Sequence, residues 1–135
     1  TYLHRLYDAR FNATYQDVLD FKNFVNAKGN KVHDVPMFFS NLILNFHLSK
    51  QTNFNLTGRY IGEQLSPIIT SPEYTVEDVF LVDCGIQVDD IVMNNFDFDI
   101  YIHNVLDTDY EQGGNPRRTY PQQGRSLLAR LKYHF

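Results

Sequence analysis

Every second position of one extended stretch carries a polar, chemically active side chain: Asp97, Asp99, Tyr101 and His103. In a β-strand this spacing points all four side chains to one face. Carboxylates and an imidazole on one surface could bind a metal ion. They could also form a hydrated wall whose charges are balanced by neighbouring basic residues. Of the two, we expect the hydrated wall, with no metal.

Basic residues near the end of the chain can supply this balance. Arg130 and Lys132 also alternate, and Arg59 lies earlier in the sequence. Opposite charges on adjacent antiparallel strands stabilise each other when they face each other. We therefore expect Asp97 or Asp99 to pair with Arg130 or Lys132.

A second group of candidate residues lies in a polar stretch rich in glycine and proline, near residues 105–124: Tyr110, Arg117, Arg118 and Tyr120. Guanidinium groups bind anions through charge-assisted hydrogen bonds and also stack on aromatic rings. The stretch is therefore a candidate binding site for an anionic or catecholate ligand. A plain solvated loop is the alternative.

Motifs of the common enzyme and cofactor classes are absent. The histidines lack the HExxH spacing, and there is no GxSxG motif, Walker loop or GxGxxG motif. Cys84 is the only cysteine, which excludes a disulfide within the chain. The net charge of −4 argues against binding to nucleic acid. We expect neither an enzyme nor a cofactor.

Strict alternation of apolar and polar residues recurs along the chain and predicts strands. The expected strands cover approximately residues 2–17, 37–48, 53–63, 78–88, 95–104 and 125–135. Each is about 10 residues or longer, which is the length that a tilted strand needs to cross a bilayer.

The expected connections alternate in length. Those near residues 18–36, 64–77 and 105–124 are long, whereas those near 49–52 and 89–94 are short. Outer-membrane barrels show this pattern, because their outer loops are long and their periplasmic turns are short. The sequence therefore predicts an all-β antiparallel meander of about six long strands from a transmembrane β-barrel.

Aromatic residues on the apolar side of these strands form two bands. Near the short turns lie Phe46, Phe54, Phe96, Tyr133 and Phe135, and near the long connections lie Tyr15, Phe38, Tyr60 and Phe80. Two such bands around an aliphatic middle, which includes Ile100 and Leu131, match the girdles of a lipid-embedded barrel. A soluble sandwich or lipocalin-like barrel, with these side chains in its core, is the alternative fold.

The final strand alternates up to an aromatic residue. Such an ending is typical of a strand that pairs with the open edge of an insertase. We expect Tyr133 and Phe135 to act as an assembly signal. Ordinary girdle positions are the alternative, and the two roles are compatible.

Several short segments together resemble a known family. They are Val35-Pro36 followed by Asn41-Leu42 and Phe46, the stretch Gly58-Arg59-Tyr60-Ile61-Gly62-Glu63, Val82-Asp83, Asn104-Val105-Leu106-Asp107-Thr108-Asp109-Tyr110, and Gly124-Arg125 before the strand that ends at Phe135. Their order and spacing resemble the carboxyl-terminal third or less of a TonB-dependent outer-membrane receptor. Val105 and Asp109 depart from the family pattern, in which leucine and a basic residue are usual.

The resemblance implies a 22-stranded barrel with an amino-terminal plug domain. Residues 1–135 would be the carboxyl-terminal portion of that barrel, and the plug and upstream strands would lie outside this chain. Six strands are too few to close a membrane barrel, so the remaining strands would come from an upstream part of the protein or, alternatively, from further chains. Five residues are expected to line the lumen: Asp97, Asp99, Tyr101, His103 and Arg130.

The resemblance also implies energised uptake of a scarce nutrient such as siderophore-bound iron, haem, cobalamin or a glycan. The expected location is the bacterial outer membrane. The expected partners are its lipid and lipopolysaccharide, the barrel-assembly machinery, the nutrient, and TonB through the plug. A passive porin-like barrel and a soluble ligand-binding β-barrel are the alternatives.

Overall fold

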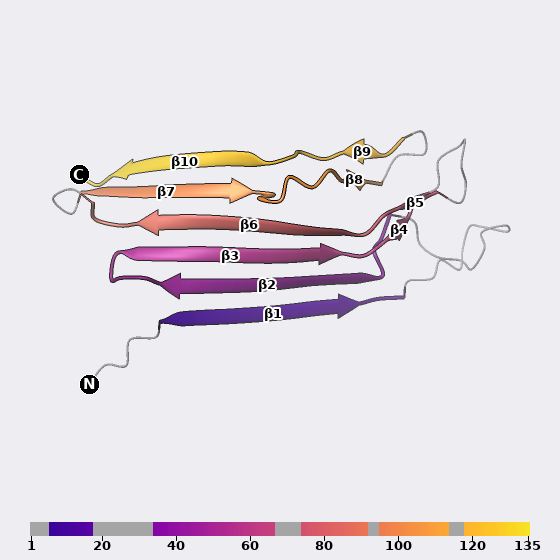
Figure 1. The fold of residues 1–135 in the computed structure, drawn as a ribbon, viewed down its shortest axis with the longest axis horizontal. Coiled ribbons are helices and arrows are strands. Elements are labelled where there is room, and N and C mark those ends of the chain that lie inside the picture. Colours follow the sequence, from indigo (N-terminus) through magenta and orange to yellow (C-terminus); the bar gives the residue numbers. More distant parts are fainter. Residues whose placement is uncertain (1–5, 18–33, 67–73, 92–94, 114–117) are drawn as a thin grey trace.

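The chain forms one antiparallel sheet of six long strands, which Figure 1 shows face-on. The computed structural model describes residues 6–17, 34–66, 74–91, 95–113 and 118–135. The strands lie in the order β1 (Tyr7–Tyr15), β2 (Phe38–His47), β3 (Thr52–Ile61), β6 (Val79–Val88), β7 (Phe96–His103) and β10 (Ser126–Tyr133). Each long strand pairs with the next one along the chain, which confirms the predicted meander.

The connections are sorted by length between the two ends of the sheet. The β2–β3 and β6–β7 turns lie at the left end in Figure 1, and the other connections lie at the right end. In the β2–β3 turn, the backbone N–H groups of Leu48 and Ser49 donate to the carbonyl of Thr52, at 2.9 and 3.1 Å. The described residues include no helix with the length and hydropathy needed to cross a membrane.

The strands are shorter than the sequence predicted, with 8 residues in β7 and β10, 9 in β1 and 10 in the others. In addition, the long connections contain two hairpins that the sequence analysis missed. They pair β4 (Gln64–Leu65) with β5 (Thr75–Val76), and β8 (Glu111–Gln112) with β9 (Tyr120–Pro121). Two residues are too few to show a period of two, so alternation could not reveal these strands.

One face of the six-stranded sheet is apolar and exposed. The register brings apolar side chains opposite one another, as in Leu44 with Leu56 and Phe98 with Leu131. Phe11 is 70% exposed and Leu131 is 65% exposed. An uncovered apolar face of this extent is rare in proteins that function alone in water and marks a contact with lipid or protein.

The small hydrophobic core lies at the end of the sheet with the longer connections. Among the described residues, the buried hydrophobic side chains are those of Val76, Val79 and Leu81. Val79 and Leu81 belong to the start of β6, and Val76 belongs to the β4–β5 hairpin. The β4–β5 hairpin therefore contributes to this core, whereas the residues of β8 and β9 are exposed.

The aromatic residues occupy both ends of the apolar face, as predicted. The ring centroids of Phe96 and Tyr133 lie 4.8 Å apart at the end with the short turns. Those of Phe38 and Tyr60 lie 5.8 Å apart at the opposite end. Such ring pairs add stabilisation beyond that of the area they bury.

Gly85 permits an aromatic ring to lie directly on the backbone of β6. A Cβ atom at Gly85 would lie 2.5 Å from Cδ1 of Tyr101, its cross-strand partner on β7. No side chain larger than hydrogen fits beneath this ring without a shift. The glycine thus fixes the place of Tyr101 on the polar face of the sheet.

Candidate functional site

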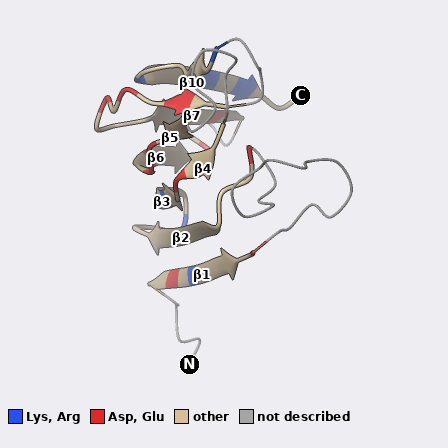
Figure 2. Ribbon diagram, turned by 90° about the vertical axis from the view of Figure 1, so that its right-hand side faces the viewer, with Lys and Arg blue, Asp and Glu red and all other residues tan. Residues whose placement is uncertain are grey.

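Asp99 and Arg130 form the strongest ion pair of the polar face. They face each other in the β7–β10 register, and Nε of Arg130 donates to Oδ2 of Asp99 at 2.7 Å. Nη2 of Arg130 lies 2.6 Å and Nζ of Lys132 lies 3.9 Å from the same oxygen. The predicted pairing between β7 carboxylates and β10 cations is confirmed. Figure 2 shows the basic residues on β10 in blue.

Asp99 is fully buried, and its second carboxylate oxygen, Oδ1, has no hydrogen-bond partner among the described residues. A buried carboxylate is tolerated when a cation compensates it, because ionised groups are costly to remove from water. The guanidinium of Arg130 therefore offsets the cost of burying the Asp99 carboxylate.

The other polar residues of β7 have partners of their own. Oδ2 of Asp97 lies 2.7 Å from Nε2 of His134, and Oδ1 of Asp97 accepts a hydrogen bond from the backbone N–H of Asp90 at 3.2 Å. Nδ1 of His103 lies 3.8 Å from Asp83. The acidic residues and the histidine of β7 thus contact different partners rather than one another. Within the described part of the chain, no three His, Cys, Asp or Glu side chains are grouped so as to hold a metal ion.

Asp83 of β6 contacts both β3 and the turn that follows β7. Its Oδ2 lies 3.0 Å from Nη2 of Arg59 on β3, and its Oδ1 accepts the backbone N–H of Asn104 at 2.9 Å. This ion pair was not predicted from the sequence. The register explains it, because Asp83 faces Thr57 and lies diagonally across from Arg59.

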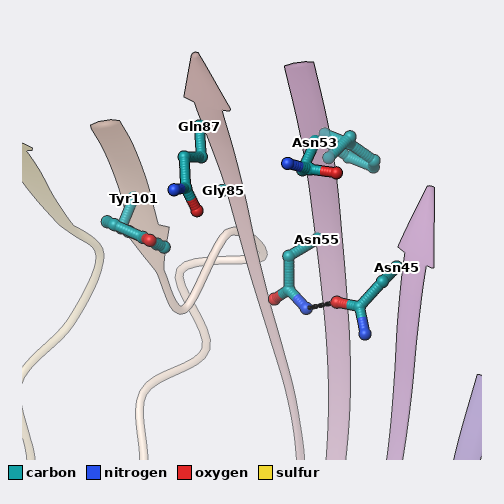
Figure 3. A pocket seen from close by; sticks show the side chains of 7 residues that line it. Asn45, Asn53, Asn55, Gly85, Gln87 and Tyr101 are labelled. Atoms are coloured by element: carbon teal, nitrogen blue, oxygen red, sulfur yellow. Dashed lines mark hydrogen bonds between the residues drawn. The ribbon is translucent and has the colours of Figure 1, made fainter. Parts of the chain in front are cut away.

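The other half of the polar face is rich in amides. Nδ2 of Asn55 donates to Oδ1 of Asn45 at 2.6 Å, and Nδ2 of Asn45 donates to Asp8 at 2.8 Å. Beside this chain of hydrogen bonds is a hollow of about 210 Å³, which Figure 3 shows. The labelled residues that line it are Asn45, Asn53, Asn55, Gly85, Gln87 and Tyr101.

The hollow presents hydrogen-bonding groups without a net charge, so it suits neutral polar groups better than ions. Gly85 contributes no side chain, and the Tyr101 ring lies over its backbone. The sequence analysis missed this site, although the alternate asparagines of β3 could have indicated an amide-rich face.

The predicted binding residues of the last long connection are partly brought together. The guanidinium carbon of Arg118 lies 5.7 Å from the ring centroid of Tyr120, which is a cation–π distance. Tyr110 precedes the same hairpin, and its carbonyl accepts the backbone N–H of Gln122 at 2.9 Å. Arg117 lies outside the described residues.

The segment Asn104–Tyr110, which carries part of the family resemblance, makes the turn that ends β7. Asn104 is buried with a left-handed φ of 51°, and its side chain both donates to the carbonyl and accepts from the N–H of Thr108. Asp107, with φ 55°, accepts hydrogen bonds from the backbone and guanidinium of Arg125 at 2.8 and 3.2 Å. Asn and Asp tolerate this backbone conformation better than most residues, so Asn104 and Asp107 shape the turn that follows β7.

The β4–β5 and β8–β9 hairpins meet at Glu111. The hydroxyl of Tyr74 donates to Oε2 of Glu111 at 3.1 Å, and the hydroxyl of Thr119 donates to the same oxygen. Hydrogen bonding to the Glu111 carboxylate raises the pKa of the Tyr74 phenol above its usual value, and partial burial adds to the effect. Nothing in the sequence predicted this contact, because its partners lie far apart in the chain.

Tyr133 and Phe135, the predicted assembly signal, form an aromatic cluster at the end of the sheet with the short turns. Their ring centroids lie 5.0 Å apart, and Tyr133 also contacts Phe96. Phe135 is fully exposed. The cluster is accessible along the β10 edge of the sheet, where no further strand is paired in the described structure.

No protein-family model matches the sequence, and no curated protein matches it. Solved structures do match. The closed form of the ferric-catecholate import receptor Fiu from E. coli K12 has a TM-score of 0.82 at 19% identity, covering 98% of this chain and 19% of the receptor. The siderophore receptor PiuA from Acinetobacter baumannii has a TM-score of 0.80 at 17% identity, covering 97% of this chain and 20% of the receptor.

A third match is the ferripyoverdine receptor of the outer membrane of Pseudomonas aeruginosa, solved with ferripyoverdine bound. Its TM-score is 0.75 at 16% identity, covering 98% of this chain and 18% of the receptor. The chain thus spans about a fifth of the length of each receptor. At these identities the likeness establishes the fold. The chain has the fold of part of the barrel wall of TonB-dependent siderophore receptors, which is the family that its sequence resembles.

Proposed function

We propose that this chain is the carboxyl-terminal portion of a TonB-dependent outer-membrane receptor that imports siderophore-bound iron. One observation carries the proposal. Almost the whole chain aligns with a ferric-catecholate import receptor at a TM-score of 0.82, and its sheet has one exposed apolar face and one polar, charge-paired face. In this proposal, the plug and the upstream strands belong to parts of the protein other than residues 1–135.

The two faces of the sheet receive different roles in this proposal. The apolar face contacts lipid, with its aromatic bands at the two membrane interfaces. The polar face lines the lumen through Asp97, Asp99, Tyr101, His103 and Arg130. Barrels of this kind carry polar groups inside because the interior is hydrated or filled by protein.

The outer loops receive the ligand in this proposal. Arg118 and Tyr120 combine a cation with an aromatic face, which suits an anionic ferric catecholate through charge and stacking. Tyr110 and Arg117 are proposed as further contacts of the same loop. A ferric catecholate is the ligand class named for the Fiu receptor.

The remaining partners follow from the same proposal. TonB acts through the plug, lipid and lipopolysaccharide surround the barrel, and the barrel-assembly machinery inserts it. Tyr133 and Phe135 serve as the assembly signal, because the β10 edge is open for pairing with another strand.

Iron uptake by whole cells tests the proposal. Cells with and without an intact gene would receive the ⁵⁵Fe(III) complex of 2,3-dihydroxybenzoate under iron limitation. We expect uptake to require the gene and to stop when a protonophore collapses the proton-motive force. Uptake that continues without energy, together with passive leakage of small solutes, would instead support a porin-like barrel.

A further inference from the structure

Glu111 joins the hairpin that carries the proposed ligand residues to a second hairpin of the outer loops. Its Oε2 accepts the Tyr74 hydroxyl, next to β5, at 3.1 Å, and it also accepts the Thr119 hydroxyl. Thr119 lies between Arg118 and Tyr120 in the sequence. Oε2 of Glu111 therefore links both hairpins, and it does so beside the cation–π pair of Arg118 and Tyr120.

The hairpins also make close contact at Gly113. A Cβ atom at Gly113 would lie 2.8 Å from Cβ of Ser66 and would collide with the side-chain oxygens of Ser66 and Asp34. Ser66 is 1% exposed, and its backbone N–H donates to the carbonyl of Tyr74 at 3.0 Å. Gly113 and Ser66 are therefore a second point of contact between the two hairpins.

The first long connection joins the same cluster. The backbone N–H of Asp34 donates to the carbonyl of Leu65 in β4 at 2.8 Å. Val76 of β5 is 3% exposed and, like Ser66, is one of the buried residues of the β4–β5 hairpin. Residues from all three long connections therefore pack against one another at this end of the sheet.

We propose that Glu111 is a positioning residue that holds Arg118 and Tyr120 on the β4–β5 hairpin, so that the outer hairpins present one pre-organised surface to an anionic ligand. This inference rests on the proposed function. Glu111 acts through Thr119 and Tyr74 and does not itself touch the ligand. Its carboxylate is engaged by two hydroxyl groups, whereas the guanidinium of Arg118 lies over the ring of Tyr120. Holding a loop in its bound conformation reduces the entropy that binding must overcome.

The test uses the native outer-membrane protein that contains this sequence. Binding of the ferric complex of 2,3-dihydroxybenzoate would be compared among Glu111→Ala, Glu111→Gln and the control Glu63→Ala, an exposed glutamate beside β4. We expect Glu111→Ala to weaken binding about tenfold, the effect of losing one hydrogen bond to a charged group. Glu111→Gln keeps an acceptor oxygen and should stay within about threefold of wild type, as should Glu63→Ala.

A double-mutant cycle separates positioning from general damage. If Glu111 acts by positioning Arg118 and Tyr120, then Glu111→Ala should have no further effect on affinity in an Arg118→Ala/Tyr120→Ala background. Equal losses of affinity in both backgrounds would overturn the inference.

Hydrogen exchange in the absence of ligand supplies an independent readout. In Glu111→Ala, but not in Glu63→Ala, the backbone amides of residues 64–66 and 75–76 should exchange faster, because the contact between hairpins is lost. Unchanged exchange would show that Glu111 does not join the hairpins and would overturn the inference. If the wild-type protein binds no ferric catecholate, the proposed ligand fails and the positioning role fails with it, while the exchange result still reports on the junction itself.

Discussion

At the scale of single residues, the structure shows how this sheet accommodates groups that are difficult to place. The buried carboxylate of Asp99 is compensated by Arg130. The ring of Tyr101 lies flat against the strand because position 85 has no side chain. Both arrangements need two strands in register, since the partners come from neighbouring strands. Two predictions belong to this scale.

Replacing Gly85 should destabilise the protein, because the contact between its backbone and the Tyr101 ring is tight. We expect Gly85→Ala to lower the free energy of unfolding by about 1–3 kcal/mol, the usual cost of overpacking. Urea unfolding of the protein in phospholipid vesicles would measure it. The double variant Gly85→Ala/Tyr101→Ala should recover most of the loss. Gly58→Ala, whose Cβ would lie 3.3 Å from the end of the Phe80 ring, serves as a milder control.

The contact between Tyr74 and Glu111 should depend on pH. In the folded protein the pKa of the Tyr74 phenol is raised above the ordinary value near 10. The contact therefore stabilises the fold below about pH 10, and this stabilisation is lost as the pH rises through the raised pKa. Tyrosine ¹³Cζ chemical shifts would follow the titration. In Glu111→Gln the pKa of Tyr74 should return toward 10. If Tyr74 titrates at the same pH in both proteins, the Glu111 carboxylate is not the cause.

At the scale of elements, the strands differ in what their two faces contact. The same strand β10 carries Leu131 on the apolar face and Leu128 on the polar face. Both side chains are exposed in the six-stranded sheet, at 65% and 53%. Exposure in this sheet therefore does not reveal which of the two side chains contacts lipid. A charged residue introduced at each position distinguishes them.

Leu131→Lys should impair membrane assembly, because a lysine at mid-bilayer on the lipid face costs about 2–4 kcal/mol. Ile100→Lys on the adjacent strand should behave alike. The control Leu128→Lys faces the lumen in this proposal and should assemble normally. The amount of folded protein in purified outer membranes measures all three. Equal assembly of the Leu131 and Leu128 variants would contradict the assignment of the faces.

The end of β10 offers a second prediction for an element. Under the proposed function Phe135 is part of the assembly signal. Phe135→Ala should reduce the amount of receptor in the outer membrane several-fold, whereas Phe135→Tyr should retain it, since tyrosine preserves the aromatic side chain of the proposed signal, and side chains give strand addition its specificity. Quantitative immunoblots of outer membranes would distinguish the two. Normal levels of Phe135→Ala would leave Phe135 as an ordinary girdle residue.

At the scale of the whole molecule, the six-stranded sheet is open at both edges. The outer edges of β1 and β10 are unpaired in the described structure, and one complete face is apolar. Unpaired edges and open backbone groups are not tolerated in the hydrocarbon of a bilayer. Under the proposed function these edges are paired in the complete barrel.

The behaviour of the complete protein in membranes tests this view. We expect it to remain in the outer-membrane fraction through washes with high salt and alkaline carbonate and to require detergent for extraction. Release into the aqueous wash in folded form would favour the alternative of a soluble ligand-binding β-barrel.

The sequence by itself determined the strands, their order along the chain and the character of each face. A period of two is a local property of the chain, and it was strong in all six long strands because one side of each is almost uniformly apolar. The same pattern placed the carboxylates of β7 and the cations of β10 on one face, so Arg130 and Lys132 could be named as candidate partners of Asp97 and Asp99. The register that sets Asp99 opposite Arg130 required the structure.

Only the tertiary structure decided the contacts between segments that lie far apart in the sequence. The hydrogen bond from Tyr74 to Glu111 spans 37 positions, and Gly113 meets Ser66 and Asp34 across even larger separations. No local pattern encodes such a contact, because it depends on how each connection folds back over the sheet. The strands could be predicted from their periodicity, whereas the arrangement of the outer hairpins required coordinates.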